Sequence, residues 1–233
     1  DDAIANGLRI LGPDVNASEY RFTPVDRGTI RYGLGAVKGT GEQAVTAILK
    51  AREAGGPFKD LFDFCRRADK RLVNRRTIEA LIRAGAFDLL DDHRARLIAS
   101  VGVAMDAAEQ AERNAMQVSL FDIFEASDDG GEHGPQYVEV PRWSERQQLN
   151  EEKLALGFYF SGHPFHGVQA EVSRFVRRPL AALEARKETQ LLAGLVVGVR
   201  SKFTARGKMA FIQIDDGTSA LEVSVFNELL EAE

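Results

Sequence analysis

Cysteine is almost absent from this chain of 233 residues, in which Cys65 stands alone. A single thiol can form neither an internal disulfide nor a four-cysteine zinc site, so the composition favours a reducing, cytosolic setting. No apolar run approaches the roughly 20 residues of a membrane-spanning helix, which excludes a transmembrane class. The sequence starts at Asp1-Asp2-Ala3 without methionine, basic leader or apolar leader core. We therefore expect no secretory signal and a chain that is a piece of a longer protein.

Groupings of side chains that hold metal ions are also missing. There is no Asp-x-Asp, and the adjacent aspartates are better assigned to a helix start, a linker and a turn: Asp91-Asp92, Asp128-Asp129 and Asp215-Asp216. None of the histidines forms a ligand-like group with the cysteine: His93, His133, His163 and His166. The sequence therefore predicts no catalytic residue and no metal site in this chain.

Charge of one sign is concentrated in two separate stretches, although the formal net charge is only −5. Residues 27–83 hold thirteen Lys/Arg and six Asp/Glu, a balance of +7. Residues 106–152 hold twelve acids and three arginines, a balance of −9. This division is typical of a chain that presents one face to a polyanion and keeps another segment away from it. Ordinary solvated charge with chance clustering is the alternative.

Apolar periodicity predicts a helical first half after a loop and short strand in residues 1–33. From Thr40 the pattern is helical, with its apolar face starting at Ala44, and Gly55-Gly56-Pro57 breaks that helix. Asp92 is expected to cap a later, Ala-rich helix. The helical domain is placed at 34–121, with further helices at Leu61–Arg67, Arg75–Arg83 and 92–115 and a basic turn at Lys70–Asn74.

The second half is predicted to change character twice. Residues 122–142 are acidic and rich in glycine, with too little apolar content to order themselves, so we expect a mobile linker. A helical connector follows at 143–189, and from 190 the apolar period becomes 2. Strands are expected at Leu191–Arg200, Met209–Asp215 and Ser219–Phe226, an antiparallel meander that starts an incomplete β-domain at 190–233. The predicted fold class is mostly α, a tandem helix-hairpin-helix, followed by a partial antiparallel β OB-fold, in a multi-domain α+β chain.

The first chemistry-bearing motif is Lys38-Gly39-Thr40-Gly41, directly before a helix. Glycines on both sides of Thr40 let the backbone approach a ligand, and the free N–H groups of a helix start suit a phosphate oxygen. The flanking apolar residues match the helix-hairpin-helix pattern that grips the DNA backbone: Leu34, Val37, Ala44 and Ile48. A capping box between Thr40 and Gln43, with no ligand, is the alternative.

A second hairpin unit lies 35 residues further on and lacks the two glycines. Its cations are expected to bind phosphate as point charges: Lys70, Arg71, Arg75 and Arg76. Two such units in tandem would contact duplex DNA by its backbone, giving affinity and position without sequence selection. Binding should then weaken steeply with salt.

The third motif is Gln117-Val118-Ser119-Leu120-Phe121, between the Ala-rich helix and the acidic linker. Its Gln-x-x-Leu-Phe pattern is similar to the peptides that bind the groove of a sliding clamp. Gln117 and Ser119 would supply polar contacts, whereas Leu120 and Phe121 would fill an apolar pocket. A helix end that buries its Leu and Phe in its own core is the alternative.

The β-meander carries a basic first loop with an aromatic residue in it. In an OB-fold this loop and the sheet face bind single strands by stacking and charge. The candidates for single-stranded DNA are Arg200, Lys202, Phe203, Arg206 and Lys208. Phe211 is also available, but it alternates with a core position, so we expect at most one stacking aromatic.

The order of these parts resembles the alpha subunits of bacterial DNA polymerase III, the C-family replicative polymerases. The resemblance extends over essentially the whole chain and includes GLRILGPDVN at 7–16, LVNRRTIEALIRAGAFD at 72–88 and LNEEKLALGFYFSGHP at 149–164. It implies that 1–33 ends the fingers region and that 34–121 is the domain that binds duplex DNA and the beta clamp. It also implies a parent DNA-directed DNA polymerase that uses Mg²⁺ on palm aspartates and works in the cytoplasm with the epsilon exonuclease and the tau clamp-loader subunit.

The resemblance leaves this chain without the palm aspartates, so we expect it to be catalytically silent and to need no cofactor. Two alternatives stay open, an error-prone paralogue of the same family and a stand-alone DNA-binding adaptor. The intact Gln-x-x-Leu-Phe peptide disfavours the paralogue, and the missing methionine and unfinished β-domain disfavour the adaptor. Palm aspartates upstream in the full reading frame would decide between the polymerase and the adaptor.

Overall fold

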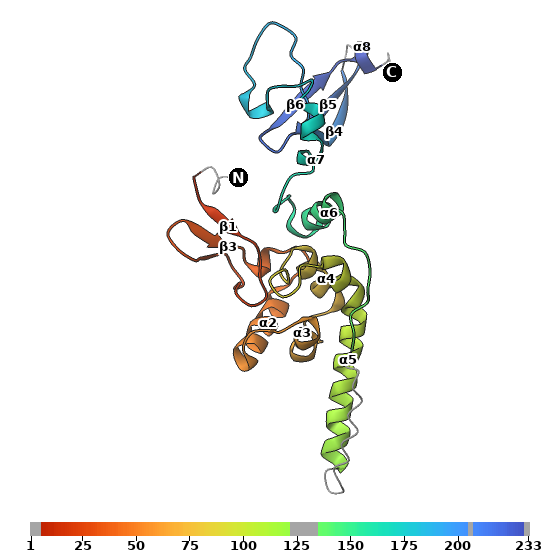
Figure 1. Cartoon of the computed structure of the whole chain (residues 1–233). Coiled ribbons are helices and arrows are strands. Elements are labelled where there is room, and N and C mark those ends of the chain that lie inside the picture. Colours follow the sequence, from red (N-terminus) through yellow and green to blue (C-terminus); the bar gives the residue numbers. More distant parts are fainter. Residues whose placement is uncertain (1–5, 122–134, 205–206, 231–233) are drawn as a thin grey trace. The chain divides into compact units, whose positions relative to one another are not determined.

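The computed structural model describes residues 6–121, 135–204 and 207–230. The chain divides into two compact units, Asp1–Phe160 and Ser161–Glu233 (Figure 1). None of the helices in the described residues is both long enough and apolar enough to cross a membrane.

The first unit opens with a small sheet that the sequence predicted only in part. Its strands are β1 (Arg9–Leu11), β2 (Thr23–Pro24) and β3 (Thr29–Arg31), in the order β1-β3-β2. β1 runs parallel to β3 and β2 antiparallel to it. Val15 and Tyr32 are buried in the same core as the helices, and the Val15 N–H donates to the Ala86 carbonyl at 2.9 Å. The described residues before 34 are therefore part of the helical unit in the structure.

Four short helical segments follow, and two of them have the predicted limits. They are η1 (Leu34–Ala36), α2 (Glu42–Gly55), α3 (Leu61–Arg67) and α4 (Arg75–Arg83). The starts of α3 and α4 are fixed locally, because the side chains of Asp60 and Asn74 accept hydrogen bonds from backbone N–H groups three residues on. In the core beneath these helices, Phe64 lies 4.9 Å from Phe58 and 5.0 Å from Phe87, measured between ring centroids.

The long helix α5 (Arg94–Phe121) differs from the prediction at both ends. At its start, His93 Nδ1 accepts a hydrogen bond from the Arg96 N–H at 3.1 Å. The carboxylate of Asp92, the expected cap, instead pairs with Arg142 at 2.8 Å. At its other end α5 continues six residues past Ala115, where it was expected to stop.

The segment that follows the acidic stretch packs against the first unit. Residues 122–134, most of the predicted linker, lie outside the described residues. Tyr137 stacks edge-on against Phe62 with centroids 4.9 Å apart, and the Val138 N–H donates to Ser100 Oγ at 2.8 Å. The prediction of a mobile linker is therefore wrong for residues 135–142, because an aromatic anchor and a backbone hydrogen bond hold them to α3 and α5.

The predicted helical connector is divided between the two units. α6 (Glu145–Leu156) belongs to the first, where Ser144 caps its start and Gly157, with φ +93°, ends it. The second unit contains α7 (His166–Val172), η2 (Leu180–Ala182), β4 (Leu195–Thr204), β5 (Gly207–Asp215), β6 (Ala220–Val225) and α8 (Asn227–Leu230). Its sheet has the order β4-β5-β6 with both pairings antiparallel, which confirms the meander.

Candidate nucleic-acid interface

The conformation of the first hairpin turn is fixed by the hydroxyl group of Thr40 and by the positive φ of Gly39. Thr40 Oγ1 donates to the carbonyls of Leu34 and Val37, both at 2.7 Å, so it ties the turn back to η1. Gly39 has φ +91°, a conformation that favours residues without a Cβ. The alternative of a Thr40–Gln43 capping box is not what the structure contains, because Gly41 is the N-cap of α2 and no side chain caps it.

The start of α2 presents backbone N–H groups next to this turn. Its first helical bond is donated by Val45 to the Gly41 carbonyl at 3.1 Å, so the N–H groups of Glu42 and Gln43 precede it. Both residues are exposed, and so is Gly41, where an added Cβ would meet nothing within 4 Å. An oxygen of a phosphate can approach these N–H groups and the positive end of the helix dipole.

Lys38 has a structural role that its sequence motif does not reveal. Its N–H donates to the Ala155 carbonyl at 2.8 Å, so α6 holds the hairpin in place. Its Nζ lies 3.0 Å from where a Cβ on Gly157 would be, at the C-terminal end of α6. A helix C-terminus favours a cation, so the ammonium group of Lys38 also stabilises this contact.

The two hairpins lie next to one another in the first unit. An added Cβ on Gly39 would lie 3.7 Å from the Cβ of Ala80, on α4. Thr77 Oγ1, in the first turn of α4, is 3.5 Å from the Gly39 carbonyl oxygen. The start of the second helix of the second hairpin therefore packs on the glycine turn of the first.

The cations of the second hairpin are exposed to different degrees and have acidic neighbours. Lys70 donates to Glu112 at 2.9 Å and Arg75 to Glu79 at 2.8 Å, whereas Arg71 is 3.7 Å from Asp69 with its side chain 93% exposed. Burial raises the pKa of Glu79, but hydrogen bonds and charges from Arg75 and Arg83 outweigh it and leave this pKa below its ordinary value. The hydrogen bond from Lys70 likewise lowers the pKa of Glu112. Arg76 is exposed on the first turn of α4.

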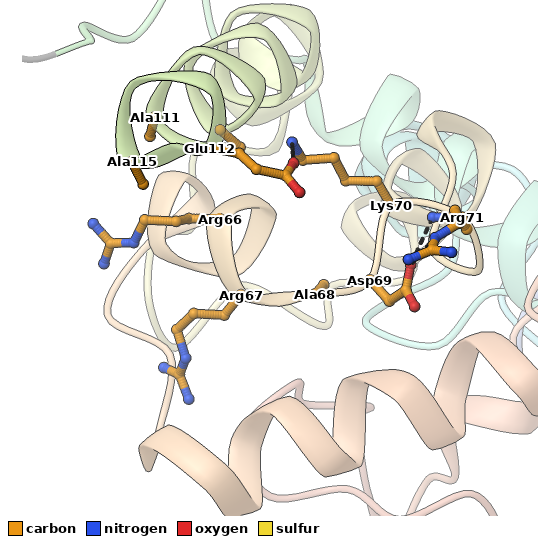
Figure 2. A pocket seen from close by; sticks show the side chains of 10 residues that line it. Arg66, Arg67, Ala68, Asp69, Lys70, Arg71, Ala111, Glu112 and Ala115 are labelled. Atoms are coloured by element: carbon orange, nitrogen blue, oxygen red, sulfur yellow. Dashed lines mark hydrogen bonds and ion pairs between the residues drawn. The ribbon is translucent and has the colours of Figure 1, made fainter. Parts of the chain in front are cut away.

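A hollow of about 590 Å³ lies between the end of α3 and one face of α5. Figure 2 shows Lys70 and Glu112 pointing toward one another across it, while Arg67 points away from α5. Arg67 donates to the carbonyls of Ala51 and Gly56 at 2.7 and 2.6 Å, so its charge is used to hold α2 and α3 together. Lining residues are Arg66, Arg67, Ala68, Asp69, Lys70, Arg71, Ala108, Ala111, Glu112 and Ala115.

Sequence reasoning missed Arg66 and Glu112 as residues of this surface. Arg66 is 62% exposed and pairs with Asp63 at 2.6 Å. Its place in a run of basic residues could have marked it, because it shares the end of α3 with the turn that carries Lys70. Glu112 carries no such signal, since 42 residues separate it from its partner.

The expected clamp peptide has a helical backbone. Residues 117–121 form the end of α5, so Gln117, Ser119, Leu120 and Phe121 are part of a continuous helix. Their side chains lie outside what the structure describes, and the interpretation of the motif stays a prediction.

The described candidates for single-strand binding lie on strands, where the sequence predicted a basic loop. Arg200, Lys202 and Phe203 belong to β4 and Lys208 to β5, with Arg206 outside the described residues. The guanidinium of Arg200 lies 4.8 Å from the centre of the Phe211 ring and pairs with Glu222 at 2.8 Å. Phe203 is 80% exposed.

The described carboxylates do not fit the Mg²⁺ that the resemblance implies for the parent protein. Among the residues that the structure describes, no three His, Cys, Asp or Glu residues gather as metal ligands would. Asp91 accepts the His93 N–H and pairs with Arg96, and Asp92 pairs with Arg142. Asp215 and Asp216 accept N–H groups of the turn after β5. Asp128-Asp129 lies outside the described residues.

Two adjacent hairpins with a glycine turn and exposed cations define a helix-hairpin-helix domain of the DNA-binding class. Residues 7–97 match the family described as helix-hairpin-helix motif. The chain is 46% identical over 231 residues to DNA polymerase III subunit alpha of Neisseria meningitidis serogroup B, a match that covers 99% of this chain. The protein of the same name is 41% identical over 243 residues in Pseudomonas aeruginosa and 39% over 238 in Escherichia coli O6:H1, covering 97% and 99% of this chain.

These matches place the chain in the family of DNA polymerase III alpha subunits. It spans about 20% of the length of the curated relatives it matches.

Proposed function

We propose that this chain is the part of a replicative DNA polymerase III alpha subunit that holds duplex DNA by its backbone while another part of the subunit carries out synthesis. The observation that supports the proposal most is the uncapped start of α2 beside the Gly39 turn. That arrangement offers N–H groups and a helix dipole to a phosphate without reading any base. The parent activity would be DNA-directed DNA synthesis in chromosome replication, in the cytoplasm, with Mg²⁺ bound outside this chain.

The second hairpin would supply charge to the same duplex. Because α4 packs on the Gly39 turn, phosphates on neighbouring stretches of one duplex would face both hairpins. Arg71 and Arg76 are the exposed cations best placed to bind them, and Lys70 and Arg75 would first have to exchange acidic partners. Each phosphate contact releases a counterion, so the affinity should depend steeply on salt.

A salt titration of duplex binding tests this function. Fluorescence anisotropy with a blunt, labelled duplex of arbitrary sequence would be measured from low to physiological salt. Four phosphate contacts give a slope of log K against log salt of about −3.6. A second duplex of unrelated sequence should bind equally well. A flat salt dependence, or a strong sequence preference, would contradict the proposal.

We infer that the end of α5 binds the beta sliding clamp as a second function. The Gln-x-x-Leu-Phe pattern at 117–121 favours it, together with the position of that pattern at the end of a helix whose residues 109–115 are exposed. Attachment to the clamp would keep the polymerase on the duplex and so supply processivity. Single-stranded DNA on the β4–β5 hairpin, and the epsilon and tau subunits on other parts of the parent protein, complete the set of proposed partners.

A further inference from the structure

Lys70 and Glu112 form an ion pair that joins the second hairpin to α5. Lys70 Nζ is 2.9 Å from Glu112 Oε2, and the two side chains are 30% and 58% exposed. Figure 2 shows the pair crossing the hollow between the end of α3 and α5. The pair thus lies at the surface, where an incoming anion can reach it.

The acidic partner of Lys70 differs in origin from those of its neighbours. Asp69 lies two residues before Arg71, and Glu79 lies four residues after Arg75, so the hairpin itself carries both acids. Glu112 comes from another helix, 42 residues along the chain. The carboxylate of Glu112 therefore does not belong to the hairpin. A substitution at position 112 leaves the sequence of the hairpin's helices and turn unchanged.

The shape of the hollow lets a phosphate oxygen reach the ammonium group of Lys70 beside the carboxylate of Glu112. The face of α5 beside Glu112 consists of alanines, Ala108, Ala111 and Ala115, which leave room above the helix. A phosphate oxygen that reaches Lys70 through this space comes close to the Glu112 carboxylate. Two anions then compete for one ammonium group, and like charges brought together are unfavourable.

We propose that Glu112 competes with the DNA phosphate for Lys70 and thereby weakens duplex binding by the second hairpin. The inference rests on the proposed function and adds to it an acidic residue that lowers the affinity for duplex DNA. A surface ion pair of this kind contributes little to stability, so Lys70 can exchange Glu112 for a phosphate at small cost. Such a residue would keep a polymerase from holding the duplex too firmly to move along it.

The test compares Glu112→Gln with Glu109→Gln in the 233-residue chain. Both changes remove one negative charge from the same helix, but Glu109 pairs with Arg113 on α5 itself. With a blunt labelled duplex in anisotropy, we expect Glu112→Gln to bind about two- to fivefold more tightly than the unchanged chain. Glu109→Gln should change the affinity by less than about twofold, since its charge is not beside a cation of the second hairpin.

A third variant ties the gain to Lys70. Lys70→Gln should weaken binding and reduce the magnitude of the salt slope by about 0.9. In the Lys70→Gln background, Glu112→Gln should add nothing, as a double-mutant cycle requires of two residues that act through one contact. Equal affinity of Glu112→Gln and Glu109→Gln for the duplex would overturn the inference. So would a lowered melting temperature of Glu112→Gln without tighter binding. If the unchanged chain shows no salt-dependent binding, the proposed function fails first, so the two failures are distinguishable.

Discussion

The buried carboxylate of Glu152 lies 3.3 Å from the buried guanidinium of Arg94, and this pair connects α6 to the start of α5. The other oxygen of Glu152 accepts the Phe160 N–H at 2.8 Å, and Arg94 also pairs with Asp88 at 2.6 Å. Since α6 in turn holds the Lys38 backbone, the glycine hairpin depends on a charged network inside the first unit.

Removing Glu152 should therefore destabilise the first unit far more than removing its neighbour. Glu152→Ala removes one of the two carboxylates that pair with the buried Arg94 guanidinium, at a cost of about 3–5 kcal/mol. Glu151→Ala is the matched control, because the Glu151–Arg83 pair at 2.8 Å is 25–29% exposed and should contribute under about 1 kcal/mol. Urea unfolding followed by the fluorescence of Trp143, the single tryptophan, measures both. Similar losses of unfolding free energy in the two variants would contradict the larger contribution assigned to the buried Glu152–Arg94 pair.

Asp63 should make the stability of the first unit depend on pH below about 4. Burial opposes its ionisation, but hydrogen bonds from Arg67, the Lys59 N–H and Arg66 outweigh burial and lower the pKa of this carboxyl. A lowered pKa means that the stabilisation is complete above the unfolded value of about 3.9 and is lost as the pH falls through the folded value.

Asp63→Asn, which does not titrate, isolates that contribution. At pH 7 the variant should be less stable by about 1.5–3 kcal/mol, the usual contribution of a hydrogen bond to a charged group. As the pH falls below about 4 the difference from the unchanged chain should shrink. Urea unfolding at pH 7, 5, 4 and 3 measures it, and a constant difference would contradict the argument.

The two hairpin glycines should respond differently to substitution. Gly39→Val forces a branched side chain into φ +91° and should weaken both the fold and duplex binding. Gly41 has φ −90° and open space around it, so Gly41→Ser is expected to stabilise the helix start by a few tenths of a kcal/mol through its new cap. Its hydroxyl would, however, occupy an N–H group that we assign to phosphate. Melting temperature and duplex anisotropy together separate the effects, and unchanged binding by Gly41→Ser would exclude close backbone approach there.

Local signals made α3 and α4 predictable, whereas distant contacts made other parts unpredictable. The starts of α3 and α4 follow from the side chains of Asp60 and Asn74, each of which accepts a hydrogen bond from the backbone N–H three residues later. A basic turn separates the two helices. β1 and β2 have three and two residues, so their identity depends on pairing with β3 rather than on any pattern of their own. At the start of α5 the sequence indicated Asp92 as the cap. Arg142, fifty residues away, pairs with Asp92, and His93 caps the helix.

The candidate site shows the same division. The glycine turn and the basic residues of the second hairpin were visible in the sequence because each is a local motif. The contact of Lys38 with α6 and the pairing of Lys70 with Glu112 depend on helices more than 40 residues away. The end of α5 was also misplaced: the helix was expected to stop at about Ala115, but no glycine or proline stops it between Ala115 and Phe121.

Leu120→Ala combined with Phe121→Ala should abolish binding to the sliding clamp while the fold survives. These two side chains are the apolar part of the proposed peptide, and both residues belong to the last turn of α5. Val118→Ala is the matched control, since position 118 is one of the unspecified positions of the motif. Isothermal titration calorimetry against the cognate clamp measures the affinity and circular dichroism the helix content. Unchanged affinity of the double variant would remove the clamp from the proposal.

Two aromatic residues of the β4–β5 hairpin should contribute unequally to single-stranded DNA binding. Arg200 pairs in register with Phe211, and Phe203 with Lys208, so the two rings lie on opposite faces of the sheet and cannot stack on one strand together. Arg200 already covers the ring of Phe211, whereas Phe203 is 80% exposed. Phe203→Ala should therefore weaken binding to a labelled oligothymidine by about 1–3 kcal/mol, the contribution of one base stacked on an aromatic ring. Phe211→Ala should reduce it less, and the reverse order would assign stacking to the face that carries Arg200.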